Sequence, residues 1–92
     1  MTDTSNLTGI GDGGISIKTV VEIMARALVD RPEAVSVSEI SSAHSLIVEL
    51  KVAKEDLGKI IGKHGRNAGA MRTIVNAVSA KTKKHIVLEI ME

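Results

Sequence analysis

The stretch Gly58–Gly69, GKIIGKHGRNAG, decides how the rest of this sequence is organised. It places glycines and basic side chains around Ile60 and Ile61. Glycine adopts backbone angles that other residues avoid, and it lets a ligand come close to the main chain. Because the patterns on both sides are helical, the unit Gly62-Lys63-His64-Gly65 is predicted to be a turn that links two helices.

A helix is predicted on the N-terminal side of this stretch. Apolar residues recur at intervals of three or four between Ile17 and Leu28, which is the spacing of one helix face. Ser16 is expected to cap the helix, because serine oxygens accept the first free N–H groups. Pro32 is expected to end it one or two residues earlier.

Two strands are predicted between this helix and the glycine-rich stretch. Val35 and Val37 alternate with serines, and the alternation slips at Glu39-Ile40, which predicts a bulge or the strand end. Residues 41–45 read as a turn. In residues 46–52 apolar and polar side chains then alternate cleanly, as in a strand with one buried face.

Two more helices and a strand complete the pattern. Glu55 and Asp56 are expected to open a short helix, since acidic side chains favour a helix N-terminus. A longer helix is predicted over about 67–81, followed by a strand over 86–90. The core stripe of the longer helix is predicted to be Met71, Ile74, Val75 and Val78.

The predicted order is therefore α-β-β-α-α-β. The first two strands would form an antiparallel hairpin, and the helical crossover permits a parallel third strand. All helices must cover one face of this three-stranded mixed sheet to bury their apolar stripes. The expected fold class is a two-layer α+β domain.

Composition excludes several classes of function. The 92 residues contain no Cys and no aromatic Phe, Tyr or Trp, so disulfides and thiolate metal sites are excluded. The three histidines have no metal-ligand spacing, and no catalytic set stands out, so we expect no metal, no cofactor and no enzyme activity. Without a signal segment or a long apolar run, the protein is expected to be cytoplasmic.

Charge is unevenly distributed along the chain. Residues 1–50 hold three Lys or Arg against seven Asp or Glu, a balance of −4, whereas residues 51–84 hold nine against two, a balance of +7. The glycine-rich stretch therefore lies in a basic patch, which is typical of a nucleic-acid-binding surface. The turn would lead into a helix N-terminus, which attracts phosphate groups.

Two nucleotide-binding motifs are near matches. Residues 9–14 fit the pattern G-x-G-x-x-G but lack a preceding strand, so residues 1–14 are read as a flexible tail and 15–92 as the domain. The phosphate-binding P-loop pattern fails because Leu57 replaces its first glycine and His64 replaces its hydroxyl residue. Neither match predicts nucleotide hydrolysis.

The segment IIGKHG resembles the signature of KH domains, an (I/V)-I-G-x-x-G loop between two helices. The element order resembles that of type II, or prokaryotic, KH domains. The segments VDRPEAV and KEDLGKIIGKHGRNAGAMRTIVNA are similar to small bacterial proteins of the KhpA kind. The resemblance implies a type II KH fold that binds single-stranded RNA through its GXXG loop, in post-transcriptional regulation or RNA chaperoning.

The resemblance also implies which residues contact RNA. One of Ile60 and Ile61 would anchor the core and the other line the nucleotide groove, and the residues alone leave open which does which. Arg72 could face RNA or solvent. The expected RNA-binding residues are Lys59, Ile61, Gly62, Lys63, His64, Gly65, Arg66 and Arg72.

A stripe of small residues on the longer helix could admit a second helix. KhpA-like proteins are associated with self-dimers and with a larger KH protein of the KhpB (Jag) kind, which favours an interface there. The alternative function is a protein-interaction adaptor that works through this stripe and not through the loop. The stripe consists of Gly69, Thr73, Asn76, Ala77 and Ala80.

Overall fold

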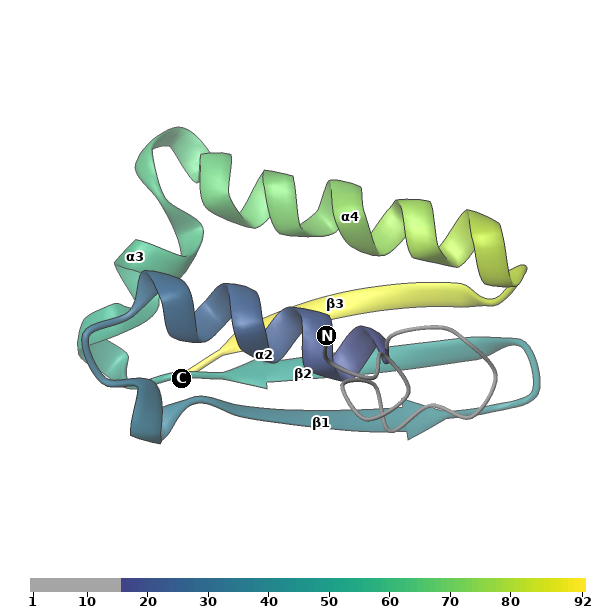
Figure 1. The fold of residues 1–92 in the computed structure, drawn as a ribbon, viewed down its shortest axis with the longest axis horizontal. Coiled ribbons are helices and arrows are strands. Elements are labelled where there is room, and N and C mark those ends of the chain that lie inside the picture. Colours follow the sequence, from purple (N-terminus) through teal and green to yellow (C-terminus); the bar gives the residue numbers. More distant parts are fainter. Residues whose placement is uncertain (1–15) are drawn as a thin grey trace, which may run out of the picture.

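The computed structural model describes residues 16–92, and the elements follow the predicted α-β-β-α-α-β order (Figure 1). The predicted tail and the glycine pattern at 9–14 lie outside the described residues. Short 3₁₀ turns precede β1, α3 and α4. The helices and strands are α2 (Ile17–Leu28), β1 (Ser36–Ser41), β2 (Ser45–Lys51), α3 (Leu57–Ile61), α4 (Arg66–Thr82) and β3 (His85–Met91).

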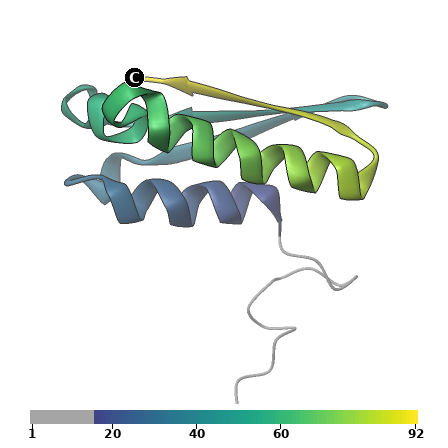
Figure 2. The same ribbon diagram turned by 90° about the horizontal axis from the view of Figure 1, so that it is seen from above.

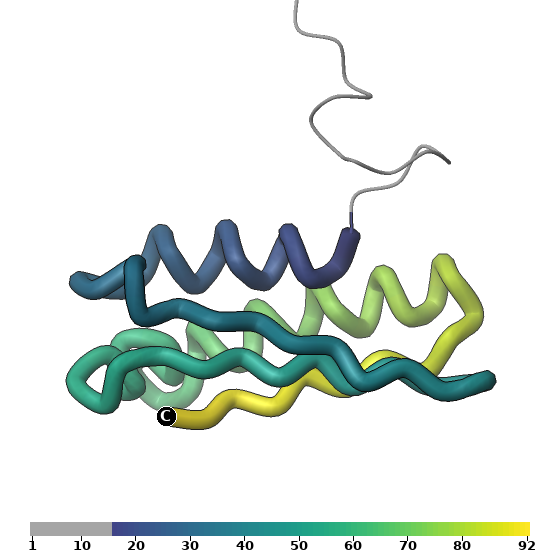
Figure 3. The backbone as a smooth tube through the Cα atoms, turned by 90° about the horizontal axis from the view of Figure 1, so that it is seen from below, coloured from purple at the N-terminus to yellow at the C-terminus, as the bar shows by residue number. Residues whose placement is uncertain are grey.

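The three strands form one mixed sheet in the order β1-β2-β3. β1 pairs antiparallel with β2 through the hairpin, and β3 pairs parallel with β2 after the helical crossover, as predicted. The helices α2 and α4 lie on the same side of this sheet (Figure 2). From below, α2 runs along the β1 side and α4 along the β3 side (Figure 3). The fold is the expected two-layer α+β arrangement.

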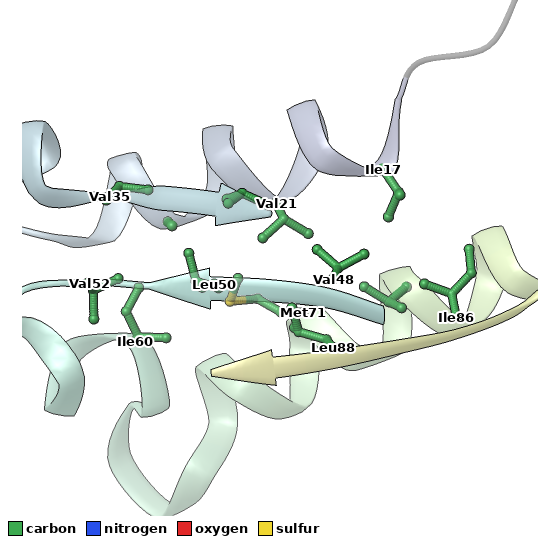
Figure 4. Close-up of a cluster of buried hydrophobic side chains, with 13 residues drawn as sticks. Ile17, Val21, Val35, Val48, Leu50, Val52, Ile60, Met71, Ile86 and Leu88 are labelled. Atoms are coloured by element: carbon green, nitrogen blue, oxygen red, sulfur yellow. The ribbon is translucent and has the colours of Figure 1, made fainter. Parts of the chain in front are cut away.

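The core lies between the sheet and the helices and is entirely aliphatic apart from Met71 (Figure 4). Val48 and Leu50, from the central strand, are fully buried at its middle. They meet Val21 from α2 and Val75 from α4, which are also closed to solvent. Because alternate residues of a strand point to opposite faces, the core uses only one face of the sheet.

The end of α2 differs from the prediction. The helix stops at Leu28, earlier than the distance from Pro32 indicates, because Val29 already has extended backbone angles (φ −97°, ψ 160°). The next two N–H groups, of Asp30 and Arg31, donate to the Asp56 carboxylate at 3.2 and 3.0 Å. The buried carboxylate takes the place of the missing helical acceptors.

Two side-chain placements also differ from the prediction. Of the two alternatives at Glu39-Ile40, the bulge is wrong, because the pairing from Ser36↔Lys51 to Ser41↔Leu46 is continuous, whereas the strand does end close by, at Ser41. Ile40 instead lies on the sheet face that the helices leave uncovered. Ile74 was expected in the core stripe of α4 but is 42% exposed, because fewer apolar positions of the helix face the core than its sequence pattern indicates.

No helix within residues 16–92 is long and apolar enough to cross a membrane.

Candidate nucleic-acid interface

The turn between α3 and α4 has the unusual backbone geometry that its glycines allow. Gly62 has φ 77° and ψ 171°, a combination essentially restricted to glycine, and Gly65 is left-handed at φ 73°. His64 between them is also left-handed, at φ 57°. Two backbone bonds close the turn: the Gly62 N–H donates to the Gly58 carbonyl oxygen at 2.8 Å, and the Gly65 N–H donates to that of Gly62 at 3.0 Å.

The turn leaves backbone donors unused. Among residues 16–92, the N–H groups of Lys63 and His64 donate to no acceptor. The long helix α4 begins at Arg66, whose N–H donates to the Lys63 carbonyl oxygen, and no side chain caps this helix. The free N–H groups of Lys63 and His64, next to the uncapped positive end of α4, favour an anion.

Asn67 holds the two helices together behind the turn. Its Nδ2 donates to the carbonyl oxygen of Lys59, at the end of α3, at 2.7 Å. The same side chain packs so closely on Gly62 that an added Cβ would lie 2.7 Å from Asn67 Cγ. Glycine at 62 is therefore required twice, by its backbone angles and by this contact. The sequence interpretation did not include Asn67, since only the folded turn brings it against Lys59.

The basic side chains of this region fall into two groups. Lys63, His64 and Arg66 are exposed, and none of them forms an ion pair within the described chain. Lys59, in contrast, lies 3.0 Å from the Asp30 carboxylate and 3.8 Å from that of Asp56. The hydrogen bond to Asp30 raises the pKa of Lys59 above its ordinary value. Of the predicted cations, Lys59 is thus already paired.

Comparisons with known proteins fit this geometry. The model of the KhpA/KhpB KH domain matches residues 18–90. This chain belongs to the KhpA/KhpB KH-domain family. The RNA-binding protein KhpA of Caldanaerobacter subterraneus subsp. tengcongensis is 54% identical over 72 residues, which cover 78% of this chain and 96% of that protein. KhpA of Clostridium perfringens is 52% identical over 75 residues, covering 82% of this chain and all of that protein.

A solved structure shares the fold of this family member. The match is to Era in complex with MgGDPNP and nucleotides 1506–1542 of 16S ribosomal RNA, with a TM-score of 0.54 and 20% identity. It covers 82% of this chain and 29% of the Era chain. At this level of identity the likeness concerns the fold alone.

The two isoleucines before the KH loop have separate positions. Ile60 is fully buried and packs in the core, whereas the adjacent Ile61 is 41% exposed beside the turn. Of the two residues between which the sequence did not decide, Ile60 is therefore the one that anchors α3 in the core. Ile61, and not Ile60, is accessible to a ligand.

Asp56 joins the end of α2 to the start of α3, the helix that precedes the loop of this KH domain. It precedes α3, is only 1% exposed, and its two carboxylate oxygens accept the Asp30 and Arg31 N–H groups described above. Buried carboxylates are rare unless they are paired in this way. The sequence indicated an acidic helix start at this position, but only the tertiary contact reveals a clamp between the end of α2 and the start of α3.

Arg72 projects from α4 toward β3, the strand at one edge of the KH sheet. Its Nη2 lies 3.5 Å from the carbonyl oxygen of Leu88, at the limit of a hydrogen bond. The residue remains exposed. Arg72 therefore lies between the helix and the strand edge and does not point into open solvent.

The predicted small-residue stripe lies on the outer side of α4. All five residues are exposed, and the Thr73 hydroxyl donates to the Gly69 carbonyl oxygen at 3.0 Å within the helix. The stripe is thus a surface ridge that does not contribute to the core.

Among residues 16–92, no group of three or more His, Cys, Asp or Glu could hold a metal ion.

Proposed function

We propose that this chain is a non-enzymatic RNA-binding protein of the KhpA kind that holds single-stranded RNA at its Gly62–Gly65 loop. The observation that carries the proposal is the loop itself: free N–H groups, an uncapped helix start, two unpaired cations (Lys63 and Arg66) and the exposed His64 occupy one short segment. The names of the KhpA relatives support RNA as the ligand.

In this proposal the loop contacts the sugar–phosphate chain and not the bases. The N–H groups of Lys63 and His64 and the N-terminus of α4 receive phosphate oxygens, and the Lys63 and Arg66 side chains add charge. Ile61 offers an apolar floor beside the loop. Arg72 would bind a phosphate in place of its 3.5 Å contact with the Leu88 carbonyl oxygen. The backbone at the edge of β3 could then form hydrogen bonds with RNA bases.

Binding by one domain is expected to be weak and tolerant of sequence. The chain has no aromatic side chain, so it lacks the base stacking that contributes about 1–3 kcal/mol per base on aromatic platforms. We expect roughly two to four phosphate contacts. Each contact contributes about −0.7 to the slope of the logarithm of the binding constant plotted against the logarithm of the salt concentration. Useful affinity then requires a second KH domain at high effective concentration.

We place that second domain on the exposed ridge of α4. A homodimer, or a complex with a larger KH protein of the KhpB (Jag) kind, would use the small side chains of the ridge to bring two helices close. Such an assembly acts in the cytoplasm, in post-transcriptional regulation or RNA chaperoning. In the adaptor alternative the same ridge works alone, and the loop has no role.

The double substitution Lys63→Asp with His64→Asp separates these functions. Titration of RNA oligomers at low ionic strength should show an affinity loss of about tenfold or more, because the loop loses the Lys63 charge and gains two carboxylates that repel phosphate. The amide NMR signals of Gly62 to Arg66 should shift with RNA only in the unsubstituted protein. Thermal unfolding and partner binding should be unchanged.

The matched control is Lys18→Asp with Ala43→Asp. Both residues are exposed and lie outside the loop, and the pair makes the same change in formal charge. It should reduce RNA affinity far less. If both double variants bind RNA as the unsubstituted chain does, the loop is not the RNA site and the adaptor function is supported.

A further inference from the structure

The sheet has a second face, which no helix covers (Figure 2). The strand register aligns side chains in rows across this face. One row is Ile40, Ile47 and Val87, and Ser45 and His85 lie nearer the hairpin turn. The next row is Ser38, Glu49 and Glu89, followed by Ser36, Lys51 and Met91. The open face therefore carries an aliphatic row beside an acidic one, with Lys51 beyond the acidic row.

The aliphatic row is exposed to solvent. Ile40 is 53% exposed and Val87 is 37% exposed, with the partly buried Ile47 between them on the central strand. Single apolar side chains are common on protein surfaces, but a continuous row across a sheet is a patch, and such patches mark interaction sites. Neither the core nor the RNA loop uses these side chains.

The acidic row has an unfavourable arrangement for an isolated domain. Glu49 and Glu89 are direct register partners on neighbouring strands, and like charges placed opposite one another destabilise a sheet. Neither forms an ion pair within residues 16–92. The two carboxylates are thus available to cations from another molecule, and they repel phosphate.

We infer that the open face docks a basic amphipathic segment of another protein. Aliphatic side chains of the segment would lie on Ile40, Ile47 and Val87, and its Lys or Arg side chains would meet Glu49 and Glu89. The acidic row matches such a segment and opposes RNA, because the two carboxylates of Glu49 and Glu89 outnumber the lysine of this face, Lys51. The inference does not depend on the proposed RNA site, because this row lies toward the hairpin turn and the loop lies at the opposite end of the fold (Figure 1).

A second copy of this chain is a poorer occupant. Three strands span only about 10 Å between the outer two, so the aliphatic row is far smaller than the roughly 800 Å² per partner of a stable interface. Packing two copies face to face would also bring the acidic rows of both into one interface. A single basic segment satisfies the carboxylates and needs less area.

An NMR titration of the full chain tests the inference. The probe is a short peptide of leucine and lysine in a helical pattern, and its control replaces every lysine with glutamate. The lysine peptide should shift the amides of Ile40, Ile47, Val87 and Glu89 and leave Gly62 to Arg66 unmoved. The glutamate peptide should shift none of them.

The variant Glu49→Gln with Glu89→Gln isolates the charge contribution. It should fold at least as stably as the unsubstituted chain, because it removes a like-charge pair, and it should bind the lysine peptide roughly fivefold more weakly. The inference is overturned if both peptides bind equally, if the shifts map elsewhere, or if the double variant binds unchanged. It is also overturned if RNA, or dilution of the free protein, shifts the same open-face amides.

Discussion

The core and the Gly62–Gly65 loop are stabilised by different interactions. In the core, aliphatic side chains from every helix and strand contact one another, and no single polar bond is needed. The loop residues lie outside this core, and the shape of the loop depends on the positive φ angles of Gly62, His64 and Gly65 and on the Asn67 bond. The comparison indicates that stability and ligand binding in this small domain depend on largely separate residues.

The largest expected effect comes from the core. Leu50→Ala should lower the free energy of unfolding by about 2–5 kcal/mol, because Leu50 is fully buried at the middle of the sheet. Since small domains have only about 5–15 kcal/mol in total, the urea midpoint should fall sharply. Ile74→Ala is the matched control, because Ile74 is exposed on α4, and its effect should stay within roughly 1 kcal/mol. If both variants lost the same free energy of unfolding, Leu50 would not belong to the buried core.

A smaller effect is expected where the backbone of the loop is most constrained. Gly62→Ala should cost about 1–3 kcal/mol from its glycine-only backbone angles, with a further loss from the contact with Asn67. Gly65→Ala should cost only about 1–2 kcal/mol, since an added Cβ at 65 meets nothing within 4 Å. Urea unfolding of both variants measures the difference. The reverse order would mean that Asn67 does not pack on Gly62.

These two regions also differ in how far the sequence predicts them. The alternation at Val48 and Leu50 predicted the buried face of the central strand correctly, because a period of two follows from strand geometry alone. The same reasoning was wrong for the burial of Ile74 and for a bulge at Ile40. A periodic pattern does not state how wide the buried sector of a helix is, nor that a sheet has apolar side chains on its second face.

The polar contacts of Asp56 and Asn67 could not be predicted from the sequence, for a different reason. Asp56 accepts N–H groups 25 and 26 residues earlier in the chain, and Asn67 donates to a carbonyl eight residues earlier across a reversal of direction. No local pattern carries such a pairing. The glycines and cations of the loop were predictable because their role depends on a short contiguous segment.

Asn67→Ala tests the polar side of the comparison. Loss of the 2.7 Å bond should cost about 1 kcal/mol, partly offset by the higher helix propensity of alanine. Asn76→Ala, also within α4, makes the same change of residue type at an exposed position and isolates the propensity gain. Amide hydrogen exchange at Gly62 to Gly65 should accelerate in the first variant only. Unchanged exchange in both would show that Asn67 does not hold the loop.

The smallest expected effect concerns Gly69, on the outer ridge of α4. An added Cβ there meets nothing within 4 Å, so Gly69→Ala should stabilise the isolated domain by up to about 1 kcal/mol through helix propensity. If a second KH domain packs on this ridge, however, the same methyl group lies between two helices that must approach closely. Sedimentation and thermal unfolding, measured together, should therefore show a more stable monomer that associates more weakly. A more stable variant with unchanged association would remove Gly69 from the proposed interface. It would leave the proposed RNA site unaffected, because the substitution lies outside the Gly62–Gly65 turn.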